Sequence, residues 1–232
     1  MVSENNRSLI IQQFDELAIQ YPRLSIAPNN TSNGLIISGI IEIDAVYKGV
    51  PLYGDFDIKI DIPEEFPKQF PVLYELSGKI PASFEHKYSD GSCCLGVTVE
   101  LYKKLSMQPT LEYYINELVI GYFFSVLWFQ RFGISPFGER SHGIAGVIEY
   151  YKEFWDTDDE LLAAKMLYTA LKPNAYRGHL PCPCGSGIIG RKCHSQQYKS
   201  IFSSAFIDQY YHDYISIYDY INKKRGKNYV RR

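Results

Sequence analysis

The sequence predicts an α+β protein: an N-terminal helix, an antiparallel β-meander and C-terminal helices, then a small cysteine-rich segment and a terminal helix. Three observations lead to this prediction. Apolar residues recur at helical spacing in residues 7–21, they alternate with charged residues in 55–62, and a nearly unbroken apolar run spans 118–129. We expect a main domain over residues 1–172 and a small second domain over 173–232.

The first half of the chain is predicted to be one helix followed by three strands. The helix covers residues 7–21 and has a single apolar face. Residues 35–46 are rich in Ile and Val, and a turn at residues 48–49 leads into residues 55–62. There the strict alternation of charged and apolar residues is typical of a half-buried antiparallel strand. The third strand covers residues 72–76.

The second half is predicted to be mainly helical. Residues 77–108 are polar, and we expect them to be irregular. A long apolar helix follows over residues 110–132, and another covers 144–154. The capping-box sequence Thr-Asp-Asp-Glu opens a helix over residues 157–171. A tyrosine-rich helix over about residues 205–223 comes last.

Composition and charge argue against two kinds of partner. The formal net charge of -2 gives no overall electrostatic attraction to nucleic acid. The polar start of the chain does not predict a signal peptide, and the apolar run at 118–129 is shorter than the roughly 20 residues that a bilayer requires. We therefore expect a cytoplasmic protein with no membrane association, whose cysteines are reduced thiols available for catalysis or metal binding.

Two of the five cysteines, Cys93 and Cys94, are adjacent in a segment rich in glycine and small polar residues. Thioester chemistry needs an exposed thiol that ionises near neutral pH, and a donor that holds the oxyanion of the tetrahedral intermediate. A loop of small residues lets an acyl donor approach the sulfur closely. From these residues alone, the alternative is a buried pair of thiols that pack as small hydrophobic side chains.

The order of elements around these cysteines resembles the ubiquitin-conjugating family. A helix and a meander are followed by a proline-punctuated segment (residues 63–72), by Gly-Ser-Cys-Cys-Leu at residues 91–95, and by Pro-Thr-Leu at residues 109–111, which opens a crossover helix. The family carries its catalytic cysteine in the context Gly-x-x-Cys-Leu. The resemblance therefore implies that Cys94 is the nucleophile and that Cys93 stands where the family usually has an aliphatic residue.

This resemblance covers roughly residues 7–155 and departs from the eukaryotic family just before the nucleophile. Eukaryotic members carry His-Pro-Asn there, and the Asn assists the oxyanion. This chain has only His-Lys-Tyr at residues 86–88, a pattern similar to the bacterial branch of the family. Oxyanion stabilisation would then come from backbone N–H groups, His86 or Ser92. Equally, His86 could be a structural residue that bonds the loop backbone.

The activity that the resemblance implies is cysteine-dependent acyl transfer. Cys94 would accept the C-terminal carboxyl group of a protein as a thioester and pass it to an amine or another nucleophile. Similar bacterial proteins occur in CBASS anti-phage operons beside a cGAS-like nucleotidyltransferase, which is therefore the expected partner, as acyl donor or substrate. The chain has no glycine-rich nucleotide loop and no metalloprotease motif, so it resembles the stand-alone form.

The other three cysteines belong to a second motif. Cys182, Cys184, Cys193 and His194 have the spacing Cys-x-Cys-x8-Cys-His, and three thiolates with one imidazole complete a closed tetrahedral zinc shell. The segment resembles the SEC-C motif, known from the tail of the SecA translocase. Four ligands leave no open position, so we expect a structural or partner-binding Zn²⁺. His179 is a competing ligand whose position fits the motif less well.

Two further interpretations remain open at this point. The first half could be a binding module that keeps the ubiquitin-conjugating fold without its chemistry, or the whole chain could be a zinc-knuckle adaptor of the SecA or ribosome type.

For Cys93 we expect a place in the core, because successive residues of an extended segment face opposite sides. The alternative is that Cys93 is a resolving thiol that protects Cys94 from oxidation.

Overall fold

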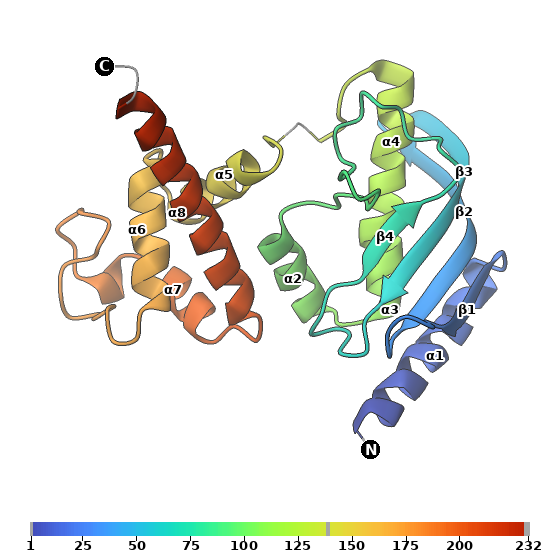
Figure 1. Ribbon diagram of the computed structural model, residues 1–232, viewed down its shortest axis with the longest axis horizontal. Helices are drawn as coiled ribbons and strands as arrows, with labels where there is room; N and C mark the ends of the chain where they lie inside the picture. Colours follow the sequence, from blue (N-terminus) through green and yellow to red (C-terminus); the bar gives the residue numbers. More distant parts are fainter. Residues whose placement is uncertain (1, 138–139, 230–232) are drawn as a thin grey trace. The chain divides into compact units, whose positions relative to one another are not determined.

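The computed structural model describes residues 2–137 and 140–229, with helices and a single sheet as predicted for an α+β protein (Figure 1). It divides into two compact units. Residues 1–96 and 100–139 form the first, and residues 97–99 and 140–232 form the second. Within the described residues, no helix is both long and apolar enough to cross a membrane.

The first unit is built on a four-stranded antiparallel sheet in which each strand pairs with the next along the chain. Its elements in order are α1 (Val2–Gln20), β1 (Leu24–Pro28), β2 (Leu35–Tyr47), β3 (Val50–Ile62) and β4 (Val72–Glu75). The predicted helix and the three predicted strands are confirmed. The edge strand β1 was not predicted, because only one of its five side chains is deeply buried and it ends at a proline.

The register of the sheet explains the alternating sequence pattern. Ile37 of β2 faces Ile60 of β3, and Ile41 faces Phe56, so the apolar side chains of both strands meet on one face. These four side chains are almost completely buried. The turn between the strands consists of Lys48 and Gly49, both with positive φ, as a two-residue hairpin requires.

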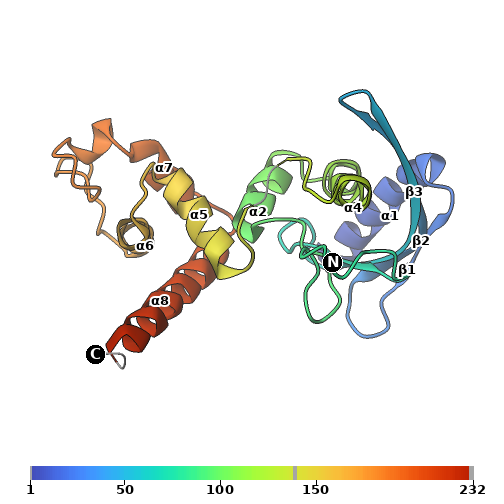
Figure 2. The same cartoon turned by 90° about the horizontal axis from the view of Figure 1, so that it is seen from above.

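A long helix covers the buried face of the sheet. It runs through α3 (Leu111–Tyr113), a π-helical turn (Tyr114–Val119) and α4 (Ile120–Phe132), which confirms the helix predicted over residues 110–132. Figure 2 shows α4 on the concave side of the curved strands. The rings of Phe56 in β3 and Phe123 in α4 stack with centroids 4.2 Å apart.

One helix of this region contradicts the sequence prediction. Residues 77–108 were expected to be irregular, but α2 (Thr98–Met107) occupies the end of this stretch. Val99, Leu101 and Leu105 are buried on it. Leu101 and Leu105 are four residues apart, as on one face of a helix, but the polar and charged residues around them obscured the pattern.

The second unit is helical. It contains α5 (Ile144–Phe154), α6 (Glu160–Leu171), a short 3₁₀ turn (Gly190–Lys192), α7 (Ser195–Phe202) and α8 (Ile207–Tyr229). The predicted helices are present, and α7 is additional. The helix α6 begins later than expected, because its cap is Asp159, whose carboxylate accepts from the backbone N–H groups of Leu161 and Leu162.

The compact units divide near residue 139, whereas the sequence analysis placed the domain boundary at residue 172. The reason is the packing of α5 and α6, which contact α8 and share one core with it. The largest completely buried side chains of this core are aromatic, namely Tyr151, Trp155, Tyr198 and Tyr210. Both helices therefore belong to the same compact unit as the cysteine-rich segment.

Candidate functional site

The adjacent cysteines lie on a small antiparallel hairpin formed by residues 86–88 and 92–94. The N–H of Tyr88 donates to the carbonyl of Ser92 (2.8 Å), and the N–H of Cys94 donates to the carbonyl of His86 (2.9 Å). On its other side, the N–H of Cys93 donates to the carbonyl of Leu73 in β4 (2.8 Å). The hairpin is thus anchored to the edge of the sheet.

The tip of the hairpin is a three-residue loop, residues 89–91, in which the N–H of Gly91 donates to the carbonyl of Tyr88 (3.0 Å). The carboxylate of Asp90 accepts from the backbone N–H (2.9 Å) and the hydroxyl (2.6 Å) of Ser92. These hydrogen bonds hold the pKa of Asp90 below its usual range. Gly91 has a φ of 87°, in the left-handed region that glycine adopts without strain. The turn fixes the register of the two arms.

Neighbouring residues of the second arm face opposite sides. Cys93 is 7% exposed and packs in the core of the first unit, whereas Cys94 is partly exposed. Burial raises the pKa of the Cys93 thiol to about 11. Lys87, opposite Cys93, points the same way, with its Nζ 4.0 Å from the buried carboxylate of Glu75. The prediction that Cys93 points into the core is confirmed.

On the Cys94 side, the structure reveals a residue that the sequence analysis did not select. The hydroxyl of Tyr88 donates a hydrogen bond to Cys94 Sγ at 3.2 Å. Partial burial and the contact with Cys94 both raise the pKa of Tyr88, so its hydroxyl keeps its proton. A two-residue Asp-Gly turn would pair Tyr88 with Cys93. The loop actually contains three residues, 89–91, which pairs Tyr88 with Ser92 and makes it the diagonal neighbour of Cys94, so the sequence carried no direct signal for this contact.

The two side-chain candidates for oxyanion stabilisation, His86 and Ser92, occupy different positions. His86 lies opposite Cys94, and its carbonyl accepts hydrogen bonds from the Cys94 N–H and from the Tyr122 hydroxyl (2.8 Å). Its ring lies against Phe84, with centroids 5.1 Å apart. The Ser92 hydroxyl donates to Asp90. The backbone carbonyl of His86 therefore has a structural role in the hairpin. A catalytic role for the His86 ring stays a prediction.

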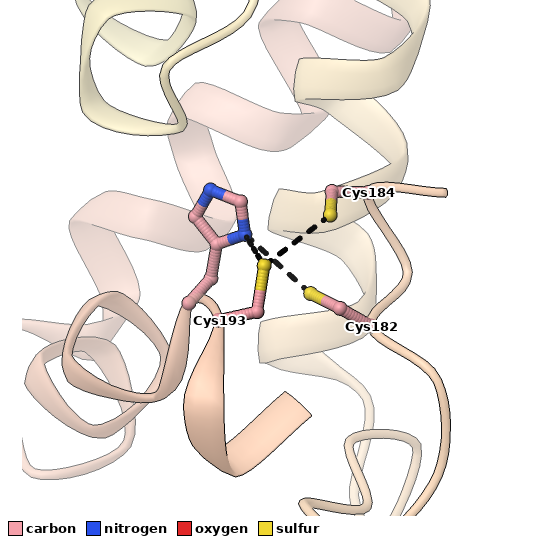
Figure 3. Close-up of side chains that lie close together, drawn as sticks. Cys182, Cys184 and Cys193 are labelled. Carbon is pink, nitrogen blue, oxygen red and sulfur yellow. Dashed lines mark hydrogen bonds between the residues drawn. The ribbon is translucent and has the colours of Figure 1, made fainter. Parts of the chain in front are cut away.

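The second site is the cluster of Cys182, Cys184, Cys193 and His194, whose four ligand atoms all lie within 4.8 Å of one another. His194 Nδ1 is 3.4 Å from Cys182 Sγ and 3.2 Å from Cys193 Sγ. The sulfurs of Cys184 and Cys193 are 3.6 Å apart. Figure 3 shows the three thiols converging. A tetrahedral zinc would hold such atoms about 3.5–3.8 Å apart, close to these distances.

Surrounding groups orient the histidine of this cluster. His194 Nε2 lies 3.0 Å from the carbonyl oxygen of Trp155. A carbonyl oxygen can only accept, so Nε2 carries a proton, and in the neutral ring the lone pair of Nδ1 faces the sulfurs. Such a second hydrogen bond is usual for a metal-bound imidazole.

Beside the cysteines, the buried hydroxyls of Tyr176 and Tyr198 have no hydrogen-bond partner in the structure.

The loop between the ligands forms a tight knuckle. The N–H of Cys182 donates to the carbonyl of Ile188 (2.7 Å), and Gly185 and Gly187 have φ values of 83° and 76°. A Cβ at Gly190 would lie 2.9 Å from the ring of Tyr176, so this position needs glycine. Local sequence therefore explains how the loop turns back on itself and brings its thiols together.

The thiols of the cluster differ in their surroundings. Burial raises the pKa of Cys182 to about 11. Burial also acts to raise the pKa of Cys184, but hydrogen bonds, foremost with Ser186, lower it to about 6. His179, the competing candidate, is exposed and lies outside this set of four. The ligand set predicted from the sequence is thus brought together by the structure and could hold a metal ion.

No protein-family model, no curated protein and no solved structure matches this chain. The chemistry of the two sites therefore rests on their own geometry. The hairpin presents one accessible thiol with one hydroxyl on its sulfur, which suits a nucleophile. The cluster directs four soft or borderline ligands toward one point, which suits a closed zinc site without an open coordination position.

Proposed function

We propose that this protein is a cysteine-dependent acyl transferase in which Cys94 forms a thioester with the C-terminal carboxyl group of a partner protein. The observation that carries the proposal is the asymmetry of the adjacent thiols. Cys94 is accessible and accepts a hydrogen bond from Tyr88, while Cys93 is buried in the core. An accessible sulfur that can ionise beside a donor is the arrangement that nucleophilic catalysis needs.

The order of elements supports a ubiquitin-conjugating-like version of this activity. A helix and a four-stranded meander precede the cysteine hairpin, and a long helix packs across the sheet after it. Together with the Gly-x-x-Cys-Leu context, this order supports a ubiquitin-conjugating-like activity. As donor or substrate we propose a cGAS-like nucleotidyltransferase in CBASS anti-phage defence. The nucleotidyltransferase partner and the role in defence rest on the sequence resemblance alone.

The reaction requires an activated acyl group. A free carboxylate is a poor electrophile, so the incoming protein must arrive as an adenylate or as a thioester on a separate activating enzyme. The Cys94 thiolate attacks the carbonyl carbon and forms a C–S bond, and the carbonyl electron pair moves to oxygen. Collapse of this oxyanion breaks the bond to the leaving group, which departs with its electron pair as AMP or as a thiolate.

For the second unit we propose one structural zinc ion held by Cys182, Cys184, Cys193 and His194, in a SEC-C-like knuckle. The metal would supply folding energy to its surroundings. Three of these side chains, the cysteines, also take part in the core formed by α5 to α8. A closed shell of four protein ligands gives the ion no place to bind a substrate, so its role is structural.

A matched pair of variants tests the proposed activity. The protein is co-expressed with an activating enzyme and the cGAS-like nucleotidyltransferase, and adducts are separated on gels with and without reductant. Wild type and Cys93→Ala should form an adduct that thiols cleave, and Cys94→Ala should form none. An adduct that survives Cys94→Ala but is lost with Cys93→Ala would refute the assignment. Absence of any thiol-labile adduct in wild type would favour a non-catalytic binding module.

A further inference from the structure

The hydroxyl group nearest to the reactive sulfur has no counterpart among the catalytic residues predicted from the sequence. We infer that Tyr88 is a catalytic residue of the Cys94 site, whose hydroxyl stabilises the Cys94 thiolate both as the attacking nucleophile and as the leaving group. The inference rests on the proposed function of Cys94. It is carried by the hydrogen bond from the Tyr88 hydroxyl to Cys94 Sγ, at 3.2 Å.

The hairpin is built to hold this contact in place. Tyr88 is tied at both backbone groups, since its N–H donates to Ser92 (2.8 Å) and its carbonyl accepts from Gly91 (3.0 Å). The Cys94 N–H is tied to His86 (2.9 Å). Asp90 fixes the turn between the two arms. The positions of the hydroxyl and the sulfur therefore follow from the register of the hairpin, which needs no ligand to form.

Two other hydroxyl groups around the hairpin are engaged elsewhere. The hydroxyl of Ser92 donates to Asp90 at 2.6 Å, and the hydroxyl of Tyr122 donates to the carbonyl of His86 at 2.8 Å. Tyr88 is about half exposed, so its hydroxyl lies where an incoming acyl group can reach the sulfur beside it. Its raised pKa means that it remains a donor while the thiol ionises.

This donor would act in both halves of the reaction. When the thiolate attacks, the hydrogen bond from the Tyr88 hydroxyl stabilises the negative charge on sulfur and holds the sulfur in position. When an amine attacks the thioester, a C–N bond forms, the C–S bond breaks, and the electron pair returns to sulfur. The Tyr88 hydroxyl then stabilises the departing thiolate. The amine proton is released to water, and Tyr88 keeps its own proton throughout.

The test compares Tyr88→Phe and Tyr88→Ala with wild type, and uses Tyr53→Phe as a control for an exposed tyrosine elsewhere in the same unit. The rate of Cys94 alkylation by iodoacetamide is measured against pH by peptide mass spectrometry, which does not depend on acyl transfer. Both Tyr88 variants should react about 10-fold more slowly near neutral pH, the scale of one hydrogen bond to a charged group. All proteins should converge at high pH, and Tyr53→Phe should match wild type.

A second measurement follows the discharge of the preformed Cys94 thioester to hydroxylamine. Tyr88→Phe should slow the discharge by a similar factor, and hydrogen exchange at the Cys94 N–H should stay as in wild type, which shows that the hairpin is intact. The inference fails if Tyr88→Phe reacts like wild type, including the case in which only Tyr88→Ala is slow. If wild type forms no thioester, the proposed function and the catalytic role of Tyr88 fall together, whatever the alkylation profile shows.

Discussion

The cysteine hairpin and the cysteine–histidine cluster place thiols near hydrogen-bonding groups in opposite ways. The hairpin separates two neighbouring thiols, turning Cys93 into the core and leaving Cys94 accessible beside one donor. The cluster gathers three thiols and an imidazole around one point, from positions up to twelve residues apart. The difference shows that the number of converging ligands, more than the presence of cysteine, separates a nucleophile from a metal site.

The two sites also differ in what holds them together. The hydrogen bonds around Cys94 come from within the hairpin and from the adjacent strand β4. The cluster depends in addition on Trp155, at the end of α5, whose carbonyl orients His194. We therefore expect damage to the hairpin to change reactivity locally, and damage to the cluster to reach the helices around it.

The largest effect is expected from removal of one cluster ligand. Wild type should contain about one zinc per chain, and Cys184→Ser should lose it and destabilise the second unit by several kcal/mol, because structural zinc contributes on the order of 10 kcal/mol to folding. Metal analysis and hydrogen exchange of peptides from residues 140–229 provide the readout. Cys94→Ser is the matched control and should keep its zinc. A metal-free wild type with a fully protected second unit would contradict this prediction.

The next effect concerns how fast the cysteines react. At pH 7 we expect maleimide to modify Cys94 at least about 100-fold faster than Cys93, because a thiol with a pKa of about 11 has roughly one part in 10⁴ as thiolate and is also buried. The cluster cysteines should be protected until a chelator is added. Peptide mapping over time measures all five thiols. Equal rates for Cys93 and Cys94 would remove the contrast on which the proposed nucleophile rests.

A smaller effect is expected from two glycines in corresponding turns. Gly91 and Gly185 both have positive φ, and a Cβ at either would meet nothing within 4 Å. Alanine at each should therefore cost only backbone strain, about 1–2 kcal/mol. Gly91→Ala should alter Cys94 alkylation without affecting zinc, and Gly185→Ala should speed zinc loss to a chelator without affecting Cys94. If either variant disturbs the other site, the two sites are coupled.

The smallest effect is expected at Cys93. Cys93→Val roughly preserves buried apolar volume, so it should cost less than about 1.5 kcal/mol and leave thioester formation nearly intact. Mild peroxide should inactivate wild type and Cys93→Val alike, because the buried sulfur is not available to resolve an oxidised Cys94. A change from reversible to irreversible inactivation in Cys93→Val would instead identify Cys93 as a resolving thiol.

Much of the fold could be predicted because its signals are local. The alternation in residues 55–62 defines the buried face of β3, and the apolar run at 118–129 defines α4. The cluster ligands could likewise be selected by spacing, since Cys182 and Cys184 share a turn and Cys193 adjoins His194. In each case the informative residues lie within a few positions of one another.

The tertiary structure decided the features that depend on pairing between distant or unpatterned segments. The edge strand β1 exists because it pairs with β2, and the division near residue 139 arises because α5 and α6 bury their apolar faces with α8. Tyr88 and Cys94 are six residues apart in the sequence, and their contact depends on the register of the hairpin that joins them. A shift of one residue would turn these side chains to opposite faces, so this register had to come from the folded chain.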